Sequence, residues 1–174
     1  LWPYSPILLA TNPEAKIDSS CIIGPYCIIG KGVTLGPHNK LLSHVILQNR
    51  TSVGQENVFY PFCVIGAEPQ DLKYNGEETS VIIGNRNSIR EAVTINIGTT
   101  NGGGVTRVGD DNLIMAYSHL GHDVQVKNHV VIGNSSQIAG HVIIEDYAIL
   151  GGMCAVSQFV RVGAHSYIGG CSGL

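Results

Sequence analysis

Two histidines and an aspartate stand close together in the segment SHLGHDVQV, residues 118–126. His119 and His122 are three residues apart, and Asp123 follows His122 directly. An imidazole beside a carboxylate can act as a general base whose ring the carboxylate orients, and clustered histidines can also bind a metal ion. The same residues also suit the polar corner of a structural scaffold. Whether these residues form a catalytic base, a metal site or a structural corner depends on the elements that hold the side chains.

A repeat of six residues governs most of the chain. Apolar residues, nearly all of them aliphatic, recur at every sixth position in three runs, which start at Ile17, at Ile83 and, after a shift of one residue, at Val108. Small or β-branched residues usually stand four positions later, so each hexad predicts a short strand with alternate side chains pointing inward. Glycine often follows the aliphatic residue directly, and it predicts a tight corner in which a positive φ costs little.

Three hexads predict one triangular coil of eighteen residues, and successive coils are expected to stack at about 4.8 Å through backbone hydrogen bonds. The predicted fold is all-β, a parallel β-helix or hexapeptide-repeat solenoid that forms a single domain over residues 1–174. Residues 67–80 and 96–107 depart from the hexads and are predicted to be two external loops on the binding side. Three glycines at 102–104 can cradle a phosphate, but they lack the lysine and the helix of a phosphate-binding loop.

Composition excludes some classes of function. The 174 residues include ten Lys and Arg against thirteen Asp and Glu, a net charge of −3, so no nucleic-acid partner is expected. No apolar run reaches the roughly 18 to 20 residues of a spanning helix, so no integral membrane segment is expected. A cytoplasmic location is expected, because most cysteines take the inward position typical of packed thiols in a reducing compartment. These cysteines are Cys21, Cys27, Cys63 and Cys154.

Stacking by eighteen residues gathers several polar groups along one edge of the predicted β-helix. His122 and Asp123 fall on a corner of a coil, where both side chains are expected to point outward. Three histidines and an aspartate beside an accessible glycine backbone favour a functional site over solvated surface residues. The residues that the stacking brings together are His119, His122, Asp123, Gly140, His141 and Gln158.

Longer segments of the sequence resemble a known enzyme family. QDLKYNGEET, IREAVTINIGT, GGGVTRVGDDNLIM, SHLGHD, AGHVIIEDYAILGGMCAVSQF and IGGCSG occur in this order within the hexads. Together they resemble the bacterial acyl-carrier-protein–UDP-N-acetylglucosamine O-acyltransferases of lipid A synthesis. The resemblance extends from about residue 17 to the C-terminus. It implies a left-handed β-helix, a homotrimer, and UDP-N-acetylglucosamine and acyl carrier protein as partners. It implies no cofactor, because the acyl donor is the thioester of the carrier protein.

The resemblance also implies roles for matching residues. His122 matches the general base that takes the proton of the glucosamine 3-hydroxyl as this oxygen attacks the thioester. Asp123 matches the carboxylate that orients the imidazole, and the N–H of Gly140 matches the oxyanion donor. Gly170 matches the position that limits the length of the 3-hydroxyacyl chain. The remaining matches to substrate-binding positions, in a cleft between subunits, are Asp71, Lys73, His119, His141 and Gln158.

The sequence departs from the family pattern in three respects. Ser157 and Asn96 stand where the family usually has histidines, which weakens the expected contacts with the nucleotide. The chain ends at GGCSGL, where the family continues into a C-terminal helical domain, so a β-helix without that domain is expected.

Three alternatives remain open at the level of sequence. A sister N-acyltransferase has the same fold but lacks the QDLKY loop. A γ-class carbonic anhydrase binds zinc on three histidines, here His119, His122 and His141. A β-helix without catalytic activity is the third. No metal is expected, because Asp123 beside His122 suits a base and its orienting carboxylate, and no CxxC pair indicates zinc.

Overall fold

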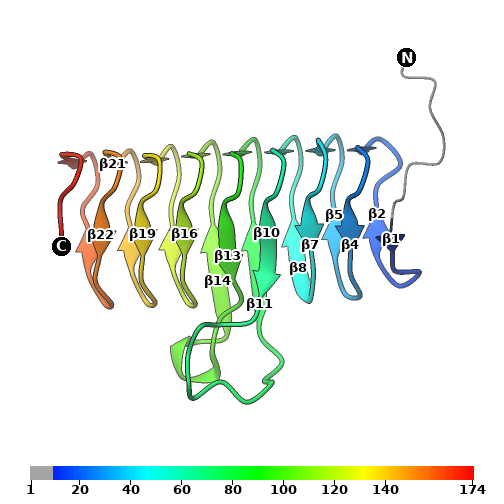
Figure 1. Cartoon of the computed structure of the whole chain (residues 1–174), viewed down its shortest axis with the longest axis horizontal. Coiled ribbons are helices and arrows are strands. Elements are labelled where there is room, and N and C mark those ends of the chain that lie inside the picture. Colours follow the sequence, from blue (N-terminus) through cyan, green and yellow to red (C-terminus); the bar gives the residue numbers. More distant parts are fainter. Residues whose placement is uncertain (1–9) are drawn as a thin grey trace.

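The computed structural model describes residues 10–174, which wind into one long stack of coils (Figure 1). Its 24 strands form three eight-stranded parallel sheets, and each sheet takes every third strand of the chain. Neighbouring strands of a sheet come from successive coils, so Ile28 pairs with Ile46, and Ile46 with Val64. The predicted all-β fold, a left-handed parallel β-helix, is thereby confirmed. Residues 1–9 of the predicted domain lie outside the described residues.

We call the three sheets A, B and C, in the order in which the chain enters them. Sheet A contains β1 (Ala10–Thr11), β4 (Ile28–Ile29), β7 (Ile46–Leu47), β10 (Val64–Ala67), β13 (Thr94–Asn96), β16 (His119–Leu120), β19 (Gln137–Ile138) and β22 (Ala155–Val156). Sheet B contains β2 (Lys16–Ile17), β5 (Thr34–Leu35), β8 (Arg50–Val53), β11 (Ser80–Ile83), β14 (Val105–Val108), β17 (Gln125–Val126), β20 (Ile143–Ile144) and β23 (Arg161–Val162). Sheet C contains β3 (Ile22–Ile23), β6 (Lys40–Leu41), β9 (Val58–Phe59), β12 (Ser88–Ile89), β15 (Leu113–Ile114), β18 (Val131–Ile132), β21 (Ile149–Leu150) and β24 (Tyr167–Ile168).

The core is the column of inward side chains inside the coils. The second residue of nearly every two-residue strand is aliphatic and points inward, as the hexad predicts. Cys27, Cys63 and Cys154 are buried free thiols in this column, and Cys21 is half-buried. Burial raises the pKa of the Cys63 thiol to about 12, so this cysteine is a packed, unreactive group.

The corners use glycine differently from the prediction. Positive φ falls mainly on the third residue of a corner, including Asp123 and His141, and nineteen described non-glycine residues adopt it. The glycine after the aliphatic residue instead lies where neighbouring coils approach closely. A Cβ on Gly109 would lie 2.6 Å from the carbonyl oxygen of Lys127 in the next coil. Glycine is therefore needed for coil-to-coil contact rather than for a left-handed backbone.

A ladder of buried asparagines runs along the corner between sheets B and C, and sequence analysis did not predict it. Each side-chain oxygen accepts the backbone N–H of the next rung, at 2.9 Å in the first three steps. The side-chain amides donate to corner carbonyls, which no strand partner can satisfy. The rungs are Asn39, Asn57, Asn87 and Asn112.

Two longer connections leave the stack at the corner between sheets A and B (Figure 1). Residues 68–79 join β10 to β11, and residues 97–104, which include the 3₁₀ helix η1 (Thr100–Gly102), join β13 to β14. Both are shorter than the predicted loops, because the flanking strands extend into them. The His122–Asp123 pair stands on the same corner, one coil further. Both interruptions of the hexad repeat therefore add loop residues on the side of the β-helix where this pair lies. Within residues 10–174, no helix is long and apolar enough to cross a membrane.

Candidate active site

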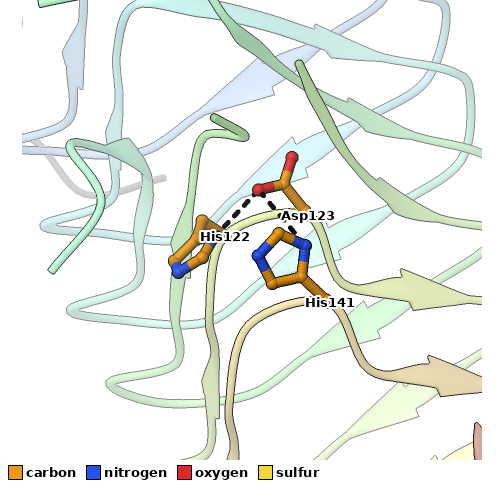
Figure 2. A group of neighbouring side chains, drawn as sticks. All are labelled: His122, Asp123 and His141. Carbon is orange, nitrogen blue, oxygen red and sulfur yellow. Dashed lines mark hydrogen bonds and ion pairs between the residues drawn. The ribbon is translucent and has the colours of Figure 1, made fainter. Parts of the chain in front are cut away.

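His122 and Asp123 form a hydrogen-bonded pair that follows β16 after one residue, Gly121 (Figure 2). Nδ1 of His122 lies 2.9 Å from Oδ2 of Asp123. A carboxylate at Nδ1 favours the tautomer that carries its proton there, which leaves Nε2 as the proton-accepting atom. The backbone N–H of Asp123 donates to Oγ1 of Thr106 at 2.8 Å, which holds the left-handed corner in place. The pair therefore has the geometry of a general base and its orienting carboxylate.

Both side chains lie outside the inward core column, as predicted, but neither is exposed to solvent. His122 exposes 8% and Asp123 3% of its surface. The connection 97–104 folds over the carboxylate, and Thr99 donates to it both its backbone N–H, at 3.0 Å, and its hydroxyl, at 2.6 Å. Hexad arithmetic places the two residues on a corner, but it contains no information about a loop that covers the corner.

Gly140 lies one coil beyond His122, where stacking by eighteen residues predicts it. A Cβ built on Gly140 would lie 2.5 Å from Cε1 and 2.6 Å from Nε2 of His122. Within residues 10–174, the Gly140 N–H has no hydrogen-bond acceptor. A free backbone donor beside a proton-accepting nitrogen can stabilise an oxyanion that forms next to the base.

Two further histidines flank the pair. The ring of His141 stacks on Phe159 at 4.5 Å between centroids, and its Nδ1 lies 3.9 Å from Oδ2 of Asp123. Nδ1 of His119 lies 2.7 Å from the hydroxyl of Thr94 in the preceding coil. Burial lowers the pKa of His119, and the nearby His122 lowers it further. His119 therefore offers a neutral imidazole to a ligand.

His122 lines a cavity of about 370 Å³. Four residues of the predicted site line it, namely His119, His122, Gly140 and Gln158. Asp123 and His141 are not among its lining residues, but Figure 2 shows Asp123 joined by dashed lines to both His122 and His141. The structure thus gathers the whole predicted edge into one site.

The rest of the cavity lining is uncharged and combines polar side chains with apolar ones such as Ile138 and Val156. Gln70, Asn96, Gln137 and Ser157 contribute amide and hydroxyl groups, and no Lys, Arg, Asp or Glu lies among the described lining residues. Asn96 and Ser157, the two departures from the family pattern, thus both face this cavity. Oδ1 of Asn96 is buried without a partner among the described residues. Such a lining suits the hydroxyl and amide groups of a sugar better than it suits a phosphate.

Three predicted residues lie away from the cavity. Asp71 and Lys73 stand in the connection 68–79, where the backbone N–H of Lys73 donates to Oδ1 of Asp71 at 3.0 Å. Gln70 of the same connection does line the cavity. Gly170 follows β24 on the corner between sheets C and A, whereas His122 is on the corner between A and B. A single chain therefore does not bring Gly170 to His122.

Comparisons with known proteins agree on one family. The sequence profile described as bacterial transferase hexapeptide (six repeats) matches residues 106–140. The acyl-[acyl-carrier-protein]–UDP-N-acetylglucosamine O-acyltransferase of Rhizobium johnstonii is 46% identical over 167 residues, 92% of this chain and 61% of that protein. The chain belongs to the UDP-N-acetylglucosamine acyltransferase family. The resemblance stated from the sequence segments is thereby confirmed.

Two further members of this family illustrate the extent of the match. The protein of the same name from Thermodesulfovibrio yellowstonii is 48% identical over 120 residues, 69% of this chain and 46% of that protein. The solved UDP-N-acetylglucosamine acyltransferase of Francisella novicida superposes with a TM-score of 0.94 at 41% identity, over 96% of this chain and 61% of that one. The chain thus spans about half to three fifths of the length of the relatives it matches.

Sequence reasoning missed the two threonines that hold Asp123. Thr106 is buried at an inward hexad position, but so are Thr51, Ser118 and Ser136, so its polarity alone did not mark it as part of the site. Thr99 lies in the connection 97–104, where no periodicity indicates which side chains turn inward. Its contact with Asp123 can be found only from the structure.

The same site offers a set of metal ligands. Ligand atoms of His122, Asp123 and His141 lie within 4.8 Å of one another. His119 is not part of this group, so the described residues do not form the three-histidine site considered from the sequence. Two imidazoles and a carboxylate suit zinc. However, Oδ2 of Asp123 already accepts hydrogen bonds from Thr99 and His122, as an orienting carboxylate would.

Proposed function

We propose that the protein transfers a 3-hydroxyacyl group from the thioester of acyl carrier protein to the 3-hydroxyl of UDP-N-acetylglucosamine, the first step of lipid A biosynthesis. The observation that carries this proposal is the position of His122, which lines the cavity together with Gly140, whose N–H is free and whose backbone lies against the imidazole. Membership in the family supplies the substrates, since its characterised relatives bear the name of this reaction.

In the proposed reaction, Nε2 of His122 takes the proton of the sugar hydroxyl while the oxygen attacks the thioester carbonyl. The carbon–sulfur bond then breaks, and the imidazolium returns the proton to the leaving thiolate. Asp123 keeps the proton of Nδ1 in place and stabilises the positive ring, because its carboxylate lies 2.9 Å from Nδ1. General base catalysis of this kind is typically worth about 10² to 10⁴ in rate. No cofactor takes part.

Gly140 supplies the oxyanion donor in this proposal. The tetrahedral intermediate places a negative oxygen on the former thioester carbon, and the backbone N–H of Gly140 is free to bind it. Because Gly140 has no side chain, the thioester can approach both this N–H and Nε2 of His122. A side chain there would collide with the imidazole.

The sugar is expected to bind in the uncharged cavity, with His119, His141 and Gln158 as contacts or supports. The cavity supplies no cation for the diphosphate, so the nucleotide must extend beyond it. Lys73 and Asp71, in the exposed connection on the same corner, are the proposed contacts outside the cavity. We propose that an adjacent subunit provides the remaining contacts with the nucleotide.

We further propose a homotrimer. Large apolar side chains are exposed on sheets A and C and on the corner between them, an arrangement typical of a surface that another subunit covers. Gly170 stands on this same corner, so in an assembly it can approach the His122 of a neighbouring copy. The exposed apolar residues of this surface are Ile22, Tyr26, Ile28, Leu42, Phe62, Tyr117, Ile149, Met153 and Tyr167, whereas Leu72, Tyr147 and Phe159 lie elsewhere.

The proposal is tested by incubating the protein with UDP-N-acetylglucosamine and 3-hydroxyacyl carrier proteins of graded chain length. Mass spectrometry of the nucleotide product should show an acyl ester on the sugar. His122→Gln should remove the activity, and His165→Gln, at an exposed corner between sheets B and C, should retain it. No product at any chain length from the folded protein would favour the inactive β-helix. Hydration of carbon dioxide would favour the carbonic anhydrase alternative.

A further inference from the structure

Thr99 is bonded to the carboxylate of Asp123 through two separate groups. Its hydroxyl donates to Oδ2 at 2.6 Å, and its backbone N–H lies 3.0 Å from Oδ1 and 3.1 Å from Oδ2. Thr99 exposes only 6% of its surface, and Asp123 only 3%. Water therefore has little access to this carboxylate, and the donors that set its orientation come from the protein.

The orientation of this carboxylate decides whether it forms a hydrogen bond with His122 or with His141. Oδ2 lies 2.9 Å from Nδ1 of His122 and 3.9 Å from Nδ1 of His141 (Figure 2). The two rings are 4.8 Å apart between centroids and nearly perpendicular. The two histidines thus compete for one oxygen, and a small rotation of the carboxylate would change the balance. The hydroxyl of Thr99 opposes such a rotation, because its short bond ends on that same oxygen.

The surrounding connection is shaped to hold Thr99 in this place. The Gly104 N–H donates to the carbonyl of Thr99 at 2.8 Å, and Gly103 and Gly104 have φ of 94° and 80°. A Cβ on Gly102 would overlap the carboxylate of Asp123. The three glycines are therefore needed to fold residues 97–104 onto Asp123. Gly102 faces the carboxylate of Asp123, which does not favour a phosphate at the same place.

We propose that Thr99 is a positioning residue for the transfer reaction. It fixes the carboxylate of Asp123 so that Oδ2 serves Nδ1 of His122 and keeps Nε2 of that ring unprotonated. The role rests on the proposed function, because it assumes that His122 is the base. Thr99 touches neither the cavity nor the reacting atoms, so its influence must pass through Asp123.

Three substitutions separate this role from simple packing. Thr99→Val keeps the size of the side chain and removes the hydroxyl, Thr99→Ser keeps the hydroxyl, and Thr100→Val changes an exposed neighbour with no bond to Asp123. We expect Thr99→Val to lower kcat about tenfold or more with little change in the KM for the sugar nucleotide. The kcat of Thr99→Ser should stay within about threefold of the wild-type value, and the kcat of Thr100→Val should equal the wild-type value. Melting curves check that each variant is folded.

A double-mutant cycle tests the route through Asp123. In an Asp123→Ala background, Thr99→Val should cause no further loss of kcat, because the group through which it acts is gone. An equal loss in both backgrounds would overturn the proposal, as would unchanged kcat in Thr99→Val alone.

A spectroscopic readout keeps the test independent of catalysis. Nitrogen-15 spectra of the imidazoles should show His122 with its proton on Nδ1 in wild type and in Thr99→Ser, and a mixture of tautomers in Thr99→Val. Unchanged spectra in Thr99→Val would contradict the positioning role. If the spectra change as expected while wild type shows no acyl transfer, the proposed function fails and the structural role of Thr99 stands.

Discussion

The imidazole of His122 lies so close to Gly140 that no side chain fits between them. A Cβ on Gly140 would be 2.5 Å from Cε1 and 2.6 Å from Nε2, well inside normal contact distance. The φ of Gly140 is not in the left-handed region, so its backbone would accept an L-residue. The requirement for glycine at this corner therefore comes from the neighbouring ring, and not from the local conformation.

Gly140→Ala should therefore displace the imidazole and leave the β-helix intact. We expect kcat to fall by about 10² or more, because both the base and the adjacent N–H donor lose their alignment. Gly163→Ala is the matched control, since a Cβ there meets only the hydroxyl of Ser166, at 3.4 Å. Steady-state kinetics and melting curves of the two variants provide the measurement. Wild-type turnover in Gly140→Ala would contradict the proposed arrangement.

His122→Ala should affect both activity and stability. Loss of the base should lower kcat at least about a hundredfold, with a modest change in substrate affinity. The ring is buried and bonded to Asp123, so its removal should also cost about 1–2 kcal/mol in the free energy of unfolding. Carrier-protein transfer assays and urea denaturation measure the two effects. Near wild-type turnover would exclude His122 as the base.

Much of the fold and part of the site follow from the hexad period alone. Strands of one sheet are separated by eighteen residues where no loop intervenes, as in the pair of Gln137 and Ala155. The placement of Gly140 beside His122, and of Gln158 in the same cavity, could therefore be predicted by counting. The asparagine ladder also had a signal, since Asn39 and Asn57 are eighteen residues apart.

The features that could not be predicted depend on segments of the chain that do not follow the hexad repeat. The burial of Asp123 results from residues 97–104, whose path has no repeat to follow. The entry of Gln70 into the cavity depends in the same way on the connection 68–79. The prediction that the corner glycines provide positive φ was wrong for a different reason. Glycine satisfies two demands, positive φ and close approach between coils, and the sequence does not distinguish them.

Metal analysis should separate the acyltransferase from a zinc enzyme. The purified protein should contain less than about one zinc per three chains, and a chelator should leave transfer activity intact. The reason is that Oδ2 of Asp123 is already engaged by Thr99 and His122. Emission spectroscopy of the protein and transfer assays after chelation make the measurement. Stoichiometric zinc, with activity lost on chelation, would indicate that His122, Asp123 and His141 hold a metal.

Acid should destabilise the protein partly through His119. Burial lowers the pKa of this imidazole in the folded state, so below the unfolded value of about 6.5 the unfolded chain binds more protons. The free energy of unfolding should therefore decrease as the pH falls below about 6.5, until His119 is protonated in both states. His119→Gln should reduce this slope in urea titrations between about pH 7 and pH 5. Parallel curves for the variant and wild type would contradict the assignment.

Gly170 should control the acyl chain length through a groove along the corner between sheets C and A. A Cβ on Gly170 would lie 3.1 Å from the carbonyl oxygen of Gly152, and one on Gly152 would lie 3.3 Å from that of Asn134. Gly170, Gly152 and Asn134 therefore stack on one another in successive coils along this corner. His122 stands on another corner of the same chain, so this groove can adjoin the His122 only of an adjacent copy. A substitution at Gly170 therefore also tests the proposed homotrimer.

Gly170→Met should shift the preference toward 3-hydroxyacyl donors shorter by about four carbons. One coil of about 4.8 Å equals about four methylenes at about 1.25 Å each, and each lost contact is worth up to about 0.8 kcal/mol. Stability should fall only modestly, because the side chain points away from the core, although its Cβ would lie 3.1 Å from the carbonyl oxygen of Gly152. Gly163→Met, on the corner between sheets B and C, is the control and should keep the wild-type preference. Competition assays with carrier proteins of graded chain length give the ratios of kcat/KM. An equal loss at every length, or an unchanged preference, would show that the acyl chain does not lie along this column.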